Sequence, residues 1–182
     1  MKKSISILFP AFVTFFLFSC NSSPEKTFGI AALNCNMLYG FGGSGMQREL
    51  ASPSVKLVDE KTMASAPMKR AEVIDEKLAR IEENYKQIKG LSSNDDSKAM
   101  IDASISLYEY VMPVYKNEYK QLAALYDDGA AADKIETMEK SIAAKYEAKF
   151  EQLYNKMLET ATAYAEKHNI PLRTVNPSPT LN

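Results

Sequence analysis

The sequence contains few residues of the types that most often bind metals or carry out catalysis. Its 182 residues include one His and two Cys. Di-iron bundles take a His from each of two helices, and thiolate zinc sites need several Cys, so both kinds of site are excluded. The single His, His168, ends a predicted helix, where the helix dipole accounts for a cation. We therefore expect no cofactor, no metal and no enzymatic activity.

An excess of charge of one sign is also lacking. The chain has 22 Lys and Arg against 23 Asp and Glu, for a formal net charge of −1. This balance excludes a strongly basic nucleic-acid binder, so we expect no nucleic-acid partner. With 46% apolar residues, the composition suits one ordinary domain with extra segments and excludes a collagen, a disulfide scaffold or a polytopic membrane protein.

The first 19 residues have the pattern of a secretory signal peptide. Lys2 and Lys3 precede an apolar run from Ile5 to Phe18. That run is about 15 residues long and contains Pro10, whereas a spanning helix needs roughly 20 apolar residues. Residues 1–19 are therefore predicted to be a signal that is removed rather than an anchor.

The run ends in Leu17-Phe18-Ser19-Cys20, which resembles the lipobox of bacterial lipoproteins. The bulky Phe18 is a mild departure from that pattern. In lipoproteins a diacylglyceryl group is attached to the Cys sulfur and a peptidase cuts before the Cys, so the resemblance implies lipidation of Cys20. Asn21 is not the Asp that retains some lipoproteins at the inner membrane, which implies an outer-membrane location. The alternative is an ordinary signal peptide with an incidental Cys.

Residues 20–66 are predicted to be a lipidated Cys and a mostly irregular tether. Five of the seven glycines fall here, four of them in the segment Gly40–Gly45. This segment fits G-x-G-x-x-G by letter, but the chain shows no βαβ alternation, so we interpret these residues as linker glycines. The apolar segment Phe28–Met46 could lie on the folded part or at the membrane interface. Val55, Leu57 and Val58 could form a short strand or a turn of helix.

The remaining chain is predicted to form three long helices, over residues 69–89, 95–126 and 134–168. In the first two, apolar residues recur in steps of three and four, which is the spacing of one buried helical face. The short connections between them favour antiparallel neighbours. We therefore expect an all-α fold, an elongated antiparallel three-helix bundle over residues 67–169, with a long N-terminal tether and a flexible tail over 170–182. Since the first helix is too short to cover the other two, the segment 28–66 or a partner must cover the rest.

Tyrosines on the predicted helical faces suggest one candidate binding site. Pro113 lies inside the second helix, where it removes a backbone donor and favours a kink. An aromatic groove beside this kink could hold a sugar, a peptide helix or a lipid tail. The simpler interpretation is that these side chains belong to the core. The candidate groove residues are Tyr108, Met112, Pro113, Tyr115, Tyr119, Tyr146 and Phe150.

Beyond the lipobox, the chain resembles small helical lipoproteins of the Gram-negative cell envelope, whose function is unassigned. The resemblance consists of tyrosine-rich amphipathic helices that follow a lipobox, and it includes no sequence motif. We expect a lipid-anchored, non-catalytic scaffold or interaction protein of the cell envelope, with the membrane and other envelope proteins as partners. The alternative is a lipoprotein that binds a ligand in the tyrosine-lined groove near Pro113.

Overall fold

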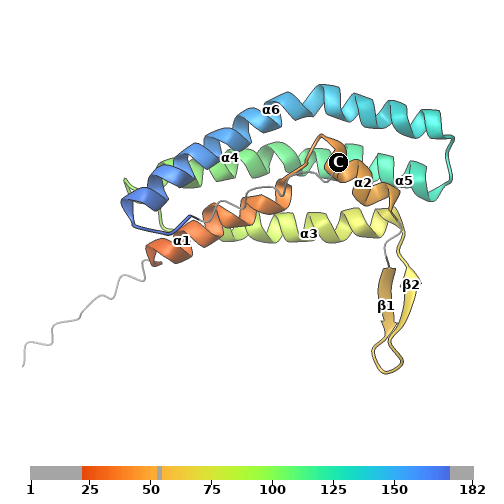
Figure 1. The fold of residues 1–182 in the computed structure, drawn as a ribbon, viewed down its shortest axis with the longest axis horizontal. Helices are drawn as coiled ribbons and strands as arrows, with labels where there is room; N and C mark the ends of the chain where they lie inside the picture. The colour runs from red at the N-terminus through yellow and green to blue at the C-terminus, as the bar shows by residue number, and fades with distance from the viewer. Residues whose placement is uncertain (1–21, 53–54, 173–182) are drawn as a thin grey trace, which may run out of the picture.

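A computed structural model describes residues 22–52 and 55–172, which form an elongated helical body with a small projecting hairpin (Figure 1). The predictions for the signal peptide, for Cys20 and for residues 173–182 of the tail lie outside the described residues.

Three antiparallel rods give the body its length. The first is α3 (Arg70–Lys89), and the third is α6 (Ala132–Lys167). The second consists of α4 (Lys98–Val114), the π-helix η2 (Tyr115–Tyr119) and α5 (Lys120–Asp127) in direct succession. The three helical ranges predicted from the apolar spacing are confirmed to within a few residues. With a rise of 1.5 Å per residue, α3 is about 30 Å long and α6 about 54 Å.

The second rod stays helical through Pro113. Proline cannot donate to the carbonyl of Glu109, which leaves an irregularity in the hydrogen-bond ladder. The π turn follows at once, and the side-chain amide of Asn117 donates to the carbonyl of Pro113 at 2.8 Å. Val114 and Lys120, which flank the π turn, both keep helical backbone angles. The sequence predicted one kinked helix here instead of two helices; the structure shows one helical path, with a π turn as the local adjustment after the proline.

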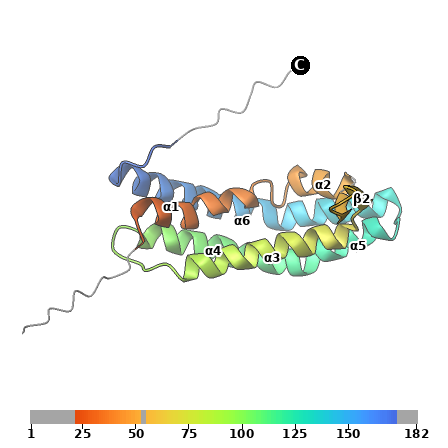
Figure 2. The same cartoon turned by 90° about the horizontal axis from the view of Figure 1, so that it is seen from below.

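The prediction of a three-helix bundle with a long N-terminal tether is wrong, first because the N-terminal segment is part of the body. Residues 22–52 contain α1 (Pro24–Ala31), the 3₁₀ helix η1 (Leu33–Leu38) and α2 (Ser44–Ala51). Figure 2 shows α1 and α2 running along the side of the long helices. Eight side chains of this segment are buried in the common core: Phe28, Ala31, Ala32, Cys35, Leu38, Phe41, Met46 and Leu50.

The physical reason lies in spacing and in coverage. Four of these residues follow one another in steps of three, four and three, so α1 and η1 each have one apolar side: Phe28, Ala31, Cys35 and Leu38. Because α3 is shorter than the other two rods, that side fills the space that α3 leaves uncovered. The apolar segment Phe28–Met46 therefore lies on the bundle.

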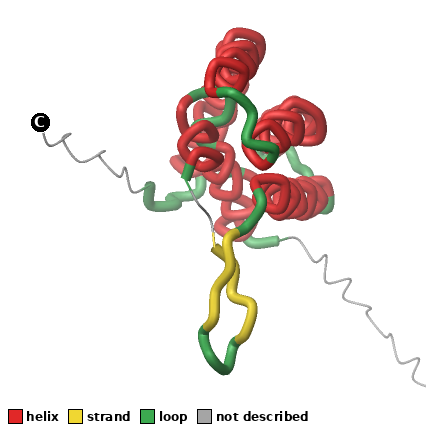
Figure 3. Tube along the Cα trace, turned by 90° about the vertical axis from the view of Figure 1, so that its right-hand side faces the viewer, coloured by secondary structure: helices red, strands yellow, loops and turns green. Residues whose placement is uncertain are grey.

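The second error concerns residues 55–67, which form a β-hairpin instead of an irregular segment. The strands β1 (Val55–Asp59) and β2 (Ala64–Pro67) pair antiparallel, with Val55 opposite Pro67 and a bulge after Leu57. In the turn, a carboxylate oxygen of Asp59 accepts hydrogen bonds from the backbone N–H groups of the second and third residues after it. Figure 3 shows the hairpin projecting away from the helices.

The first turn of α3 is capped by a residue from the far end of the second rod. The two carboxylate oxygens of Asp127 accept hydrogen bonds from the backbone N–H groups of Arg70 and Ala71, at 2.8 and 3.0 Å. These N–H groups have no partner within the helix. Since Asp127 ends α5, this contact fixes the antiparallel alignment of the first two rods.

Candidate functional site

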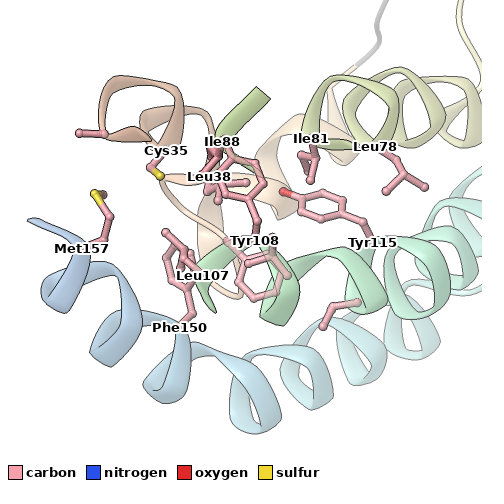
Figure 4. Close-up of a cluster of buried hydrophobic side chains, with 14 of the residues drawn as sticks. Cys35, Leu38, Leu78, Ile81, Ile88, Leu107, Tyr108, Tyr115, Phe150 and Met157 are labelled. Carbon is pink, nitrogen blue, oxygen red and sulfur yellow. The ribbon is translucent and has the colours of Figure 1, made fainter. Parts of the chain in front are cut away.

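The predicted groove residues come together in the fold, but most of them are core. Tyr108, Tyr115, Tyr119 and Phe150 are buried, and Figure 4 shows three of them inside the bundle. Met112 and Tyr146 are partly buried against the core, whereas Pro113 is exposed on the outside of the rod. Pro113 therefore does not line the interior beside these aromatic side chains.

Phe41 fills the space between the aromatic side chains of the second rod and α6. Its ring centroid lies 4.9 Å from that of Phe150 and 5.7 Å from those of Tyr115 and Tyr119. Such separations are those of packed aromatic pairs. The candidate groove near Pro113 is thus occupied by a side chain of the protein itself. Phe41 was not recognised as a core residue from the sequence, because glycines flank it.

The glycines around Phe41 hold a tight turn against α6, so their interpretation as linker residues is wrong. Gly40 and Gly42 have φ angles of +80° and +76°, a region that favours glycine. A side chain at Gly42 would bring its Cβ within 3.0 Å of the Cα of Glu147. The N–H of Gly42 donates to the hydroxyl oxygen of Tyr119 at 2.8 Å. These contacts place Phe41 in the core.

The buried tyrosine hydroxyls serve as hydrogen-bonding groups that fasten the N-terminal segment. Tyr108 donates to the carbonyl of Asn34 at 2.9 Å, and Tyr115 contacts the sulfur of Met46 at 3.5 Å. Burial raises the pKa of both phenols above the ordinary value, which keeps them neutral in the physiological range. Neutral, buried and already bonded phenols fit a structural role.

The surroundings of Cys35 and His168 also fit structural roles for these two residues. The Cys35 thiol is buried and donates to the carbonyl of Ala31 at 3.3 Å, and burial raises its pKa to about 12. A thiol in that state is a poor nucleophile. His168 follows the last residue of α6, with Nε2 3.6 Å from a carboxylate oxygen of Asp96. Among the described residues, no group of three or more His, Cys, Asp or Glu side chains could hold a metal ion.

An open groove lies on the surface between the glycine turn and α6. Its volume is about 710 Å³, and both apolar and charged side chains line it. Tyr39 stands at its edge with 81% of its surface exposed, and its ring centroid lies 6.5 Å from that of Tyr154. Arg48 and Glu147 supply charges of opposite sign. Tyr39 was not predicted to be a site residue, because it lies within residues 20–66 and nothing in the sequence distinguished it from the other residues of that predicted tether.

The hairpin is the second candidate surface. Four of its side chains are large, apolar and at least half exposed: Val55, Leu57, Val58 and Met63, the last with 72% of its surface exposed. An isolated two-stranded hairpin is at best marginally stable in water. Two free strand edges and uncovered apolar side chains are features of a docking element.

Comparisons with protein families, curated proteins and solved structures found no match for this chain. Over residues 22–52 and 55–172, the structure contains no helix with the length and apolar character required to cross a bilayer.

Proposed function

We propose that this chain is a lipid-anchored, non-catalytic interaction protein of the bacterial cell envelope, held in the outer membrane by a lipid on Cys20. The lipobox-like sequence Leu17–Cys20 supports the anchor. The helical body begins directly after it, since Ser23 is already the N-cap of α1 and accepts a hydrogen bond from the N–H of Lys26. The anchor therefore holds the body close to the lipid surface instead of at the end of a long tether.

The observation that carries the interaction role is the exposed hairpin. Half of the large apolar residues that stand exposed in the described structure are on its 13 residues, 55–67. An ion pair between Lys56 and Glu72 joins the hairpin to α3, with the Nζ and carboxylate oxygen 2.5 Å apart. A partner envelope protein could cover these side chains and pair with a free strand edge.

Photo-cross-linking in intact envelopes tests this role. A photoreactive amino acid at Met63, at the hairpin turn, should give discrete adducts with one or a few envelope proteins. Lys140 on α6 is a matched control position, because its side chain is also about three quarters exposed (72%). Adducts at both positions, or at neither, would argue against a docking hairpin. In the variant carrying Leu57→Ser and Val58→Ser, the Met63 adducts should become weaker.

Lipid labelling tests the anchor separately. Cys20→Ala should abolish incorporation of labelled fatty acid and leave the uncleaved precursor, while Cys35→Ala should be processed like the wild type. A Cys20→Ala protein that is still acylated would contradict the proposed anchor.

The alternative, a ligand held in the tyrosine-lined groove near Pro113, has less support. Phe41 occupies the interior beside those tyrosines, and Pro113 itself is on the surface. We therefore favour the interaction role.

A further inference from the structure

Exposed apolar side chains also gather at a second place, on η1 and α6 instead of the hairpin. Leu33 and Tyr39, at the two ends of η1, are 54% and 81% exposed, and Leu158 on α6 is 42% exposed. We call the surface formed by Leu33, Asn36, Tyr39, Tyr154 and Leu158 the η1–α6 face.

The 3₁₀ geometry of η1 makes this face continuous. Residues three apart in a 3₁₀ helix lie above one another, so Leu33, Asn36 and Tyr39 share one side of η1. All three are exposed, while Cys35 and Leu38 on the inner side are buried. The sequence of η1 therefore orients one strip toward the core and another toward solvent.

Contacts with α6 extend this strip into a broader surface. The hydroxyl of Tyr154 donates to the side-chain oxygen of Asn36 at 3.3 Å, which ties the middle of the strip to α6. Tyr39 and Leu158 line the same groove, and Leu158 follows Tyr154 by about one helical turn of α6. The η1–α6 face thus combines two exposed apolar side chains, two tyrosines and an amide.

We infer that the η1–α6 face rests on the surface of the lipid bilayer. The inference depends on the proposed lipid anchor, because the chain length between anchor and face is its main argument. Cys20 precedes Ser23 by three residues, which span at most about 10 Å. The eight residues of α1 add about 12 Å. Leu33 is therefore held within about 30 Å of a point fixed in the membrane, and the face begins there.

The chemistry of the face suits the interfacial region of a bilayer. Tyrosine is enriched at membrane–water interfaces, where its ring meets apolar groups and its hydroxyl meets water. Leucine can enter the acyl boundary, and the guanidinium of Arg48, an exposed residue that lines the same groove as Tyr39, can bind a lipid phosphate. Glu147 and Glu151 in the same groove oppose deep insertion. The contact is therefore shallow, and it orients a body whose attachment comes from the anchor.

A single tryptophan can report this contact, because the chain has no natural Trp. Tyr39→Trp places the reporter on the η1–α6 face, and Met63→Trp places a matched control on the hairpin. Both sites are strongly exposed, so neither change should perturb the fold. Each variant would be produced with its own N-terminal segment in a lipoprotein-processing bacterium. The purified lipidated protein would then be reconstituted into vesicles of phosphatidylethanolamine and phosphatidylglycerol.

In these vesicles, the fluorescence emission of Tyr39→Trp should lie at a shorter wavelength than the emission of the same variant without its lipid, measured in buffer free of detergent. Brominated acyl chains should quench it by about twofold or more, as expected for an interfacial side chain. The Trp at position 63 should keep its emission and resist quenching. Leu33→Trp, a second reporter on the same face, should behave like Tyr39→Trp.

Flotation of the vesicles distinguishes a failure of this inference from a failure of the proposed lipid anchor. Protein that floats with the vesicles while the Trp at 39 stays unquenched would retain the anchor and overturn the assignment of the face. Equal quenching at 39 and 63 would also overturn it, since the hairpin would then contact lipid just as well. Protein that carries no lipid and does not float would overturn the proposed anchor together with this inference.

Discussion

The N–H of Gly42 donates a hydrogen bond to the hydroxyl oxygen of Tyr119 across 77 positions of sequence, at a distance of 2.8 Å. Both groups are buried. The bond joins the glycine turn, which carries Phe41, to the π turn in the second rod. It therefore connects the segment that the sequence predicted to be a tether with the most irregular point of the bundle.

Removing the Tyr119 hydroxyl group should destabilise the protein more than removing the hydroxyl group of an exposed tyrosine. In Tyr119→Phe, the buried N–H of Gly42 would lose its partner, which typically costs about 1–3 kcal/mol. Tyr85→Phe is the matched control, since the Tyr85 hydroxyl bonds to Glu109 in an exposed position. Urea unfolding monitored by circular dichroism measures both. Equal midpoints for the two variants would show that the Gly42 bond adds nothing measurable.

Phe41 and Tyr39 offer a direct comparison of two aromatic side chains two residues apart. Phe41→Ala should lower the free energy of unfolding by about 3–5 kcal/mol, because it empties the centre of an aromatic cluster. Tyr39→Ala should change it by less than about 0.5 kcal/mol, because the ring is exposed. Thermal melts of both variants would check this. A small effect of Phe41→Ala would mean that the glycine turn does not anchor the N-terminal segment.

Pro113→Ala should leave the stability unchanged or raise it, by at most about 3 kcal/mol. The replacement restores a backbone donor for the carbonyl of Glu109, and little packing is lost because Pro113 is exposed. Differential scanning calorimetry of the variant gives the change. A clearly lower melting temperature would indicate that the π turn after Pro113 depends on the proline ring.

Stability should fall at alkaline pH. Burial raises the pKa of Cys35 from 9.0 to about 12 and also raises the pKa of Tyr119. Because the unfolded chain loses these protons first, their contribution is complete below about pH 9 and is lost as the pH rises toward about 12. The urea midpoint should therefore be lower at about pH 10.5 than at about pH 8.

Cys35→Ala serves as the control for this pH dependence. It removes one of the buried acids and should make the alkaline decline less steep than in the wild type. A midpoint that is the same at both pH values would contradict the buried, neutral state of these groups.

The long helices could be predicted from the sequence because each one repeats the same spacing many times. In α3, for example, Ile74, Leu78 and Ile81 lie on one face and are all buried. The N-terminal helices have at most eight residues, so a periodic pattern has little room to appear. Their place in the core depends on what α3 leaves uncovered, which is a property of the whole fold.

The aromatic cluster around Phe41 was predicted in part, as a grouping of side chains and not as a binding site. The sequence correctly grouped Tyr115, Tyr119 and Phe150, because helical spacing puts them on facing sides of two rods. It could not show that Phe41 lies between them, since this depends on a glycine turn that approaches the backbone of Glu147. The hairpin was also hard to foresee, because its strands are four and five residues long and Met63 in its turn takes a positive φ of 55°.

The bond between Tyr154 and Asn36 spans 118 positions, and the core joins residues from α1 to those near the end of α6. Contacts of such high sequence separation form late in folding, because the intervening chain must first be brought together. The N-terminal helices pack against α3, α4 and α6, so Phe28 and Cys35 reach their full burial only once all three later helices are in place. Until then, apolar side chains near the N-terminus remain open to solvent, and the nascent chain is most prone to aggregate in that interval.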